Sequence, residues 1–346
     1  MFAGPLSILF IAINVGAFAI MVQSGVPAMD PDASQLRAWG GTYAYAVRSG
    51  EWWRLLTCGF IHSGAVHLAV NCYALFQIGG AVERLFGKSH YAALYLLTLL
   101  ISSVSATLWN PIVVTVGASG AVFGVFGAII SFLLVRRHEL DPRLTRPFLA
   151  QAVVIIAINL AYGLSVPGIS NAGHLSGLLS GLLLGAVMAR PLSDPMARER
   201  FFRPRLLTGI SIGAAAIAAG VVLVVLTAPR YDLLALIDRI DATEGRFGDD
   251  WNDMIERRRA GAIDDAATAD EVEGRYLPIA RAIEKDLDQA TRLVPRRLRD
   301  RLAEEQERAS LRRQALEHYV IGLRSADKES LARFRELWEK SVQPPP

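Results

Sequence analysis

The stretch GASGAVFG, residues 117–124, places a single hydroxyl, that of Ser119, among glycines and apolar residues. The residues before this stretch, IVVTV, and the residues that follow it up to position 135 are apolar as well. A serine becomes a nucleophile when a base lies beside its hydroxyl, and no residue of this segment is a base. Ser119 is therefore either a small residue at a helix contact or a nucleophile whose partner lies far away in the sequence.

Candidate partners occur in two other apolar stretches. HSGAVHLAVN contains His62, His67 and Asn71, and SNAGHLSGLLSGLLLG contains His174. Polar groups inside lipid are costly, so each one requires a partner or a function. Any one of these histidines, taken alone, is as consistent with a hydrogen bond between packed helices as with catalysis. Because four residues separate His67 from Asn71, both side chains point from one face of a helix.

The elements that carry these residues are apolar. Hydrophobic residues make up 52% of the 346-residue chain, and charged residues only 20%. Apolar segments of about 17–23 residues recur, and a bilayer core of ~30 Å requires helices of that length. The composition therefore predicts an all-α, polytopic membrane helix bundle. The seven predicted spans are residues 5–22, 60–82, 91–109, 119–135, 147–165, 172–189 and 206–228.

Charged residues divide the chain unequally. Residues 1–229 contain 14 Arg and Lys and 8 Asp and Glu, whereas residues 230–346 contain 22 and 25. Stretches of the second part, such as RLRDRLAEEQERASLRRQALEHYVIGLRS, repeat apolar residues with a helical period. We expect three or four helices there, and we favour a small helical bundle or flexible solvated helices over a module that recruits substrates.

The loops between the predicted spans indicate their orientation. Loops after the second, fourth and sixth spans contain 11 of the 14 basic residues of the apolar part, and loops 110–118 and 166–171 contain none. Since basic residues accumulate in cytoplasmic loops, these basic loops and the N-terminus are predicted to be cytoplasmic. Seven spans then place residues 230–346 outside the cytoplasm.

This orientation brings the candidate residues to one depth in the membrane. The spans that carry His67, Ser119 and His174 enter from the non-cytoplasmic side, and each residue lies near the start of its span. Rows of small residues allow membrane helices to pack closely. One such row lies in the span of His174, and a second lies in the span of Ser119. The two rows are Gly173, Gly177, Gly181 and Gly185, and Gly120, Gly124 and Ala128.

Close packing of these two spans predicts a Ser119–His174 pair. An imidazole beside a serine hydroxyl activates it, and no carboxylate within the spans is placed to orient His174, so we expect a dyad. His67, Asn71 and the backbone N–H of Ser119 are suitable donors for an oxyanion. Phe123, one turn beyond Ser119, is placed to stack on the imidazole.

Other chemistries lack their motifs. The sequence around Ser119 is not G-x-S-x-G, because alanine stands two residues after the serine. His62 and His67 lack the H-E-x-x-H spacing of zinc proteases, so no metal is expected. No phosphate-binding loop is present, no cofactor is expected, and topology rather than nucleic-acid binding explains the basic loops. Cys58 and Cys72 are interpreted as small apolar side chains.

Together these motifs resemble the rhomboid family of intramembrane serine proteases. The resemblance lies in GASGAVFG, in the H-x4-H-x3-N spacing of the first histidine stretch, and in AGH followed by the glycine row. EWWR at 51–54 and GGAVERLFG at 79–87, which has a G-x3-E-x3-G spacing, match as well. The resemblance covers residues 1–190 and implies a six-helix rhomboid core. The seventh span resembles the six-plus-one arrangement within that family.

The resemblance also implies the roles of individual residues. Ser119 is implied to be the nucleophile and His174 the general base. Phe123 stands where some relatives have tyrosine, which retains the ring. Outside the site, the resemblance places Trp53 and Arg54 in a membrane-embedded first loop and Glu83 in a structural network. The residues implied to serve the oxyanion or to support the site are His67, Asn71, Gly117, His62 and Phe123.

The predicted domains are a core at 1–190, a loop with the seventh helix at 191–229, and a charged extramembrane helical tail at 230–346. The predicted protein is an intramembrane serine endopeptidase of a bacterial plasma membrane, and its partners are the lipid bilayer and single-pass or other membrane-protein substrates. The alternative is a catalytically silent rhomboid-like protein that binds membrane proteins for trafficking. A transporter is disfavoured, because the span interiors contain almost no charges.

Overall fold

A computed structural model describes residues 4–165, 170–192, 195–293 and 296–342. Every regular element in these ranges is a helix, and the only extended pairing within them is an isolated bridge between Thr42 and Thr115. The chain divides into two compact units, residues 1–228 and 229–346, which we call the membrane unit and the tail unit. The predicted all-α, polytopic fold class is therefore confirmed.

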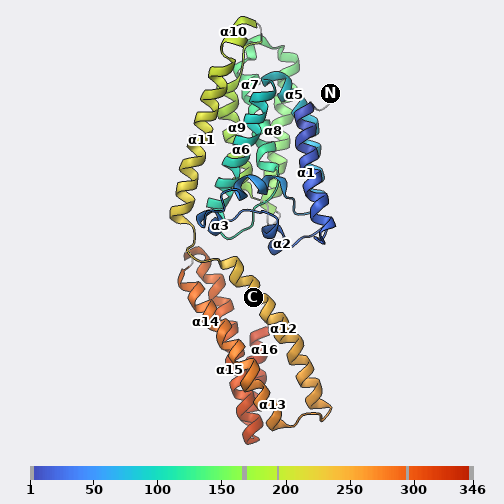
Figure 1. Ribbon diagram of the computed structural model, residues 1–346, viewed down its shortest axis with the longest axis vertical. Coiled ribbons are helices and arrows are strands. Elements are labelled where there is room, and N and C mark those ends of the chain that lie inside the picture. Colours follow the sequence, from blue (N-terminus) through green and yellow to red (C-terminus); the bar gives the residue numbers. More distant parts are fainter. Residues whose placement is uncertain (1–3, 166–169, 193–194, 294–295, 343–346) are drawn as a thin grey trace. The chain divides into compact units, whose positions relative to one another are not determined.

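The membrane unit is a bundle of seven long apolar helices (Figure 1). Six of them have at least 18 residues and are apolar enough to cross a membrane, and the seventh, α7, has 17 residues. The seven helices are α1 (Pro5–Gln23), α5 (Ala65–Phe86), α6 (Lys88–Trp109), α7 (Ser119–Val135), α8 (Pro142–Ser165), α9 (Asn171–Met188) and α11 (Phe202–Thr227).

The predicted spans match these helices within a few residues, and the largest differences lie at the starts of α5 and α8. The span predicted from residue 60 begins at Ala65, because the preceding residues turn. Gly64 has φ of +125°, a left-handed value that favours glycine, and a Cβ there would also meet the carbonyl oxygen of Met29. Apolarity continues through this turn, so hydropathy alone does not locate the helix start.

Helix α7 is the buried centre of the membrane unit. Thirteen of its 17 residues are buried, and its side chains join an apolar core with α5, α6 and α9. A helix of 17 residues is about 26 Å long, shorter than a bilayer core of ~30 Å. Burial by neighbouring helices explains how the shortest of the seven is accommodated.

The glycine row of α9 packs directly on α7. A Cβ at Gly177 or Gly181 would overlap the backbone of Gly120 or Gly124, respectively, and one at Gly185 would meet Ala128. The helices therefore touch backbone to backbone in the predicted register. Gly120 and Gly124 of α7 also contact α6, because a Cβ at these positions would meet the side chains of Ser102 and Thr98, respectively. The same two glycines therefore allow α7 to pack closely against both α9 and α6.

At the Ser119 end of the bundle, where α5, α7 and α9 begin, the first loop forms short helices and packs on the loop before α7. Two backbone hydrogen bonds join Thr42 and Thr115, at 3.1 and 2.8 Å, and the N–H of Gly117 donates to the carbonyl of Cys58 at 2.8 Å. The segment that presents Ser119 is thus fixed by backbone bonds before the helix starts. The short helices are α2 (Ala33–Ala38), α3 (Ala44–Arg48), α4 (Arg54–Thr57) and η1 (Cys58–Phe60).

At the Arg190 end, where α5, α7 and α9 finish, charged side chains cap other helices. Arg190 donates to the carbonyls of Arg84 and Leu85 in the last turn of α5, at 2.7 and 2.6 Å. Arg136 donates to Ala189, which follows α9, at 2.7 Å. Helix C-termini leave carbonyls unsatisfied and attract cations, so these arginines stabilise helix ends.

Two further charged residues cap helices in the same way. The carboxylate of Glu83, on α5, accepts the backbone N–H of Leu6 at 3.1 Å and so caps the start of α1. Arg48, at the end of α3, donates to the carbonyls of Val225 and Ala228 at the end of α11. The N-terminal and seventh helices are therefore attached to the bundle by charges from other elements.

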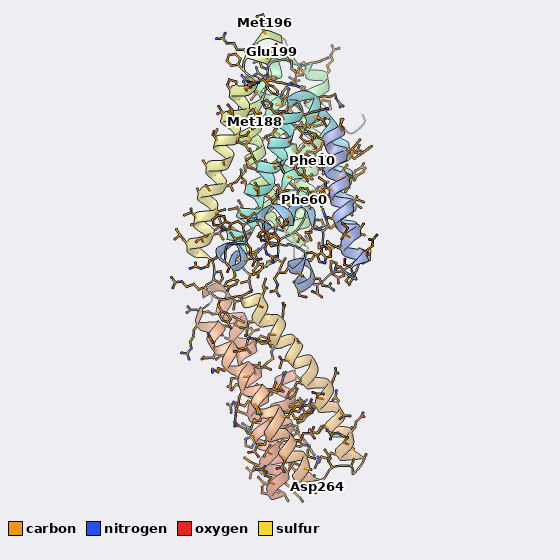
Figure 2. The ribbon with its side chains drawn as sticks, viewed as in Figure 1. Phe10, Phe60, Met188, Met196, Glu199 and Asp264 are labelled. Carbon is orange, nitrogen blue, oxygen red and sulfur yellow. The ribbon has the colours of Figure 1, made fainter. Side chains whose placement is uncertain are left out.

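Figure 2 marks the two ends of the membrane unit: Met196 and Glu199 lie on α10 (Pro195–Arg200) at one end, and Phe60 lies toward the other. The basic loop that contains α10 and the first loop that contains Phe60 thus occupy opposite ends (Figure 1). This separation agrees with the alternation of loops from which orientation was predicted.

The tail unit consists of amphipathic helices around an aromatic cluster. Trp251 stacks on Trp338, with ring centroids 4.9 Å apart, and meets Tyr276 edge to face at 5.3 Å. A π-helical segment joins α13 to α14, so these two helices form one continuous run. With that run counted once, the described residues of the tail unit form four helical runs, in agreement with the expected three or four. The helices are α12 (Leu233–Arg259), α13 (Asp265–Glu271), η3 (Val272–Tyr276), α14 (Leu277–Leu293), α15 (Arg296–Ser325) and α16 (Lys328–Val342).

Candidate active site

Ser119 and His174 lie within hydrogen-bonding distance. Ser119 is the first residue of α7, His174 lies in the first turn of α9, and Oγ of the serine is 2.8 Å from Nε2 of the imidazole. Both side chains are half-buried. The glycine contacts between α7 and α9 bring these helix starts together, because the two backbones touch at Gly177 and Gly181, just after the pair, with no side chain between them.

The imidazole of His174 is oriented by an aromatic ring. The ring of Phe123, one turn after Ser119, stacks on it with centroids 4.5 Å apart and planes 9° from parallel. Nδ1 of His174 is buried and has no hydrogen-bond partner among the described residues. No carboxylate in those residues therefore orients this imidazole, and stacking on Phe123 fixes its plane.

His67 and Gly117 meet beside the serine. A Cβ at Gly117 would lie 2.6 Å from Cε1 and 2.8 Å from Nε2 of His67, so the ring occupies the space that any larger residue would fill. Gly117 also has φ of +113°, which L side chains rarely adopt. Glycine is thus required at this position both for the backbone turn and for the approach of His67.

Asn71 lies one turn below His67 on the same face of α5. Its side chain is almost fully buried, at 4% exposure, and its Nδ2 donates to the carbonyl of His67 at 2.9 Å. An amide NH₂ has two donors, and this bond uses one of them. The second N–H is available in chemical terms for a ligand near His67.

His62 and Ser63 hold His67 from its other sides. The fully buried ring of His62 meets the ring of His67 edge to face, with centroids 5.2 Å apart. Oγ of Ser63 lies 2.9 Å from Nδ1 of His67. Ser63 is not among the site residues expected from the sequence. Its spacing of four residues before His67 is the signal by which it could have been found.

The remaining family-implied residues lie away from this pair. Arg54 packs over the ring of Trp53 at 4.6 Å, pairs with Glu51 and donates to first-loop carbonyls, so it stabilises that loop. Glu83 caps α1 at the Arg190 end. In the described residues, no group of three or more His, Cys, Asp or Glu side chains is arranged to hold a metal ion.

The arrangement can perform acyl transfer without a formal charge at rest. A hydroxyl contacts an imidazole nitrogen at the start of α7, and the imidazole of His67 lies against Gly117, two residues before that hydroxyl. The first N–H groups of a helix lack intrahelical acceptors and carry a positive dipole. Such a site suits a reaction in which an oxyanion develops next to the serine.

The chain matches the Rhomboid domain over residues 49–191. It is 30% identical to "Rhomboid protease GluP" of Bacillus subtilis over 290 residues, 83% of this chain and 53% of that protein. It is 34% identical to "RHOMBOID-like protein 4" of Arabidopsis thaliana over 164 residues, 47% of this chain and 41% of that protein. It is 28% identical to "Rhomboid protease AarA" of Providencia stuartii over 193 residues, 50% of this chain and 68% of that protein.

The chain spans about half the length of the first two of these relatives. The similarity to GluP covers more residues than the 228 of the membrane unit, so it extends into the tail unit, beyond the 1–190 expected from the motifs. Apolar helices and the matched domain agree on a multi-pass membrane protein. This chain belongs to the rhomboid family, whose named relatives include proteases.

Proposed function

We propose that this protein is an intramembrane serine endopeptidase that uses Ser119 as nucleophile and His174 as general base. The observation that carries the proposal is the 2.8 Å distance between Oγ of Ser119 and Nε2 of His174, two residues that are 55 positions apart in the sequence and lie on different helices. A nucleophile and base within hydrogen-bonding reach, with the base oriented by a third group, is the usual arrangement of covalent hydrolases. Here stacking on Phe123 supplies that orientation.

In this mechanism, Nε2 of His174 takes the proton of the Ser119 hydroxyl while Oγ attacks the carbonyl carbon of the scissile peptide bond. The tetrahedral intermediate then collapses, and His174 donates the proton to the departing amine. A water molecule, activated by the same imidazole, hydrolyses the acyl-enzyme and releases the second product. Each proton that leaves the serine or water is thus returned by His174.

The oxyanion of the intermediate is assigned to three donors. They are the backbone N–H of Ser119, the free N–H of the Asn71 amide, and Nε2–H of His67. Gly117 permits the close position of His67, and His62 supports its ring from behind. Donors fixed before the reaction stabilise developing charge most effectively where water is scarce.

Substrates are proposed to be single-pass or other membrane proteins, cut in or near their transmembrane helices. The family resemblance implies a small residue before the scissile bond and a locally unstable helix. The basic loops at the Arg190 end support an orientation in which that end and the N-terminus face the cytoplasm of a bacterium. In that orientation, water and substrate reach Ser119 from outside the cytoplasm, and seven spans predict that residues 230–346 are also outside it.

A catalytically silent family member that binds membrane proteins is the competing function. Loss of the serine or the histidine would favour it, and both are present at bonding distance. Purified protein treated with a fluorophosphonate probe separates the two functions. We expect labelling and cleavage of a transmembrane substrate, with both abolished by Ser119→Ala and cleavage abolished by His174→Ala.

The matched control is Ser165→Ala, which changes an exposed serine of α8. This variant should retain labelling and cleavage. Normal proteolysis by Ser119→Ala would show that the nucleophile is a different residue. A wild-type protein that is folded but neither labels nor cleaves would favour the silent binding protein.

A further inference from the structure

Three contacts fix the imidazole of His67, and together they leave one ring nitrogen facing the site. His62 packs against the ring edge to face at 5.2 Å, and Gly117 lies against Cε1 and Nε2. Ser63 occupies the remaining nitrogen, because its Oγ lies 2.9 Å from Nδ1. Of the two ring nitrogens, Nε2 lies nearer to Gly117, at 2.8 Å from the position of a Cβ there against 3.7 Å for Nδ1, and it is the nitrogen that Ser63 does not contact.

The protonation of this ring decides whether Nε2 donates or accepts. A neutral imidazole has one N–H and one lone pair, and the hydrogen bond at one nitrogen determines the other. His67 is half-buried beside the imidazole of His62, and no carboxylate of the described residues bonds to its ring. A positive charge on it would be partly removed from water and would have no anionic partner among those residues, so the neutral form is favoured.

We propose that Ser63 is a positioning residue that donates its hydroxyl proton to Nδ1 of His67 and thereby holds the proton of that ring on Nε2, facing the site. The inference rests on the proposed function, because an Nε2–H is useful only if an oxyanion forms beside it. In the opposite tautomer, Nδ1–H would donate to Ser63 and a lone pair on Nε2 would repel the oxyanion.

Ser63 is suited to this role by its position in the chain. It lies four residues before His67 and directly before Gly64, where the backbone turns into α5. Its bond to His67 is therefore formed within the turn that starts the helix, and it does not depend on the packing of α7 on α9. The serine acts on the site only through His67, and it does not contact the Ser119–His174 pair in any bond described here.

The tautomer can be measured directly without activity. Full-length protein carrying Ser119→Ala and ¹⁵N-labelled histidine is reconstituted in lipid, and its ring-nitrogen resonances are recorded at neutral pH. Protonated and unprotonated ring nitrogens resonate in separate ranges, and the signals of His67 are identified by their loss in a His67→Gln variant. We expect Nε2 to be protonated and Nδ1 to be unprotonated, and we expect Ser63→Ala to populate the second tautomer.

Kinetics supply the second readout. In Ser63→Ala, kcat should fall about fivefold with little change in KM, a loss equivalent to about 1 kcal/mol, the usual net value of a neutral hydrogen bond. Ser63→Thr, which keeps the hydroxyl, should restore both the tautomer and kcat. Ser24→Ala changes another exposed serine, at the C-cap of α1, and should alter neither.

The outcomes separate this inference from the proposed function. Protonated Nδ1 in the wild-type ring, protonation of both nitrogens, or an unchanged tautomer in Ser63→Ala would overturn the role of Ser63 even if Ser119→Ala abolishes cleavage. If Ser63→Ala fails to fold, the His67 resonances of the protein that retains Ser63 and of the Ser63→Thr variant still show which ring nitrogen is protonated. Cleavage that survives Ser119→Ala would overturn the proposed function while leaving the tautomer measurement valid.

Discussion

At the scale of single residues, the candidate site is built from neutral side chains. Ser119, His174, His67 and Asn71 contribute hydroxyl, imidazole and amide groups, and neighbouring rings rather than carboxylates hold them. An isolated carboxylate in a membrane would carry a large desolvation cost. Orientation by stacking on Phe123 avoids that cost and still restricts the imidazole to one plane.

Replacement of Asn71 tests the oxyanion assignment. Asn71→Ala removes one donor that is fixed before the reaction, and such losses typically lower kcat by ~10²–10³. We expect that fall in kcat with a smaller change in KM, measured by steady-state cleavage of a transmembrane reporter. Asn159→Ala is the control, because Asn159 bonds only to the carbonyl of Ile155 within α8. A rise in KM with unchanged kcat would instead assign Asn71 to substrate positioning.

At the scale of helices, the site depends on the distance between α7 and α9. Their backbones touch at Gly177 and Gly181, and the Ser119–His174 pair lies above these contacts. Reacting groups tolerate displacements of well under ~1 Å before rates fall sharply. Residues that never touch substrate are therefore expected to control the rate through helix separation.

A graded alanine series tests this dependence. A methyl group at Gly177 or Gly181 would overlap backbone atoms of α7, whereas one at Gly173 would lie 3.5 Å from its nearest neighbour. We expect Gly177→Ala and Gly181→Ala to lose activity and about 1–3 kcal/mol of stability, the usual cost of overpacking. Gly173→Ala should retain both, as should Gly16→Ala in α1, where nothing lies within 4 Å. Activity and thermal unfolding measure the series, and full activity in Gly181→Ala would contradict it.

The capping contacts at the Arg190 end make a second prediction at this scale. Arg190→Ala removes two hydrogen bonds from a charged donor to the carbonyls of Arg84 and Leu85, and a hydrogen bond to a charged group contributes about 1.5–3 kcal/mol. Thermal unfolding in detergent should therefore occur at a lower temperature. Arg200→Ala, at an exposed arginine of α10, should have little effect. Equal melting of both variants would show that the capping bonds contribute little.

At the scale of the whole molecule, the arginines whose distribution predicts the orientation also cap helices. Basic residues gather in the loops of the Arg190 end, and Arg136 and Arg190 among them also cap helix C-termini. At the Ser119 end, Arg48 is bound to the end of α11 and so does not indicate a cytoplasmic loop. The capping role removes one apparent exception to the charge bias.

Thiol labelling tests the orientation that this bias predicts. In a background without Cys58 and Cys72, a cysteine is placed at exposed Ala262 of the tail unit or at exposed Arg143 at the start of α8. A membrane-impermeant reagent applied to intact cells or spheroplasts should label the first and spare the second. Labelling at Arg143 alone would invert the topology and place Ser119 toward the cytoplasm.

The sequence by itself determined the elements of this protein. Apolarity over the length of a bilayer is a local property, so all seven membrane helices were located, and the span that starts at Ser119 was placed without error. Glycine spacing is also local, and it predicted both the contact of α7 with α9 and its register. The proximity of Ser119 to His174 followed from these two patterns.

Only the tertiary structure decided the contacts that involve backbone groups and ring orientations. The bond of Arg48 to Val225 and the bridge between Thr42 and Thr115 have no periodic signal. A carbonyl oxygen is the same for every residue type, so the sequence does not show which helix end an arginine caps. Which nitrogen of an imidazole faces a neighbour likewise depends on the packing around the ring, which forms only when distant helices meet.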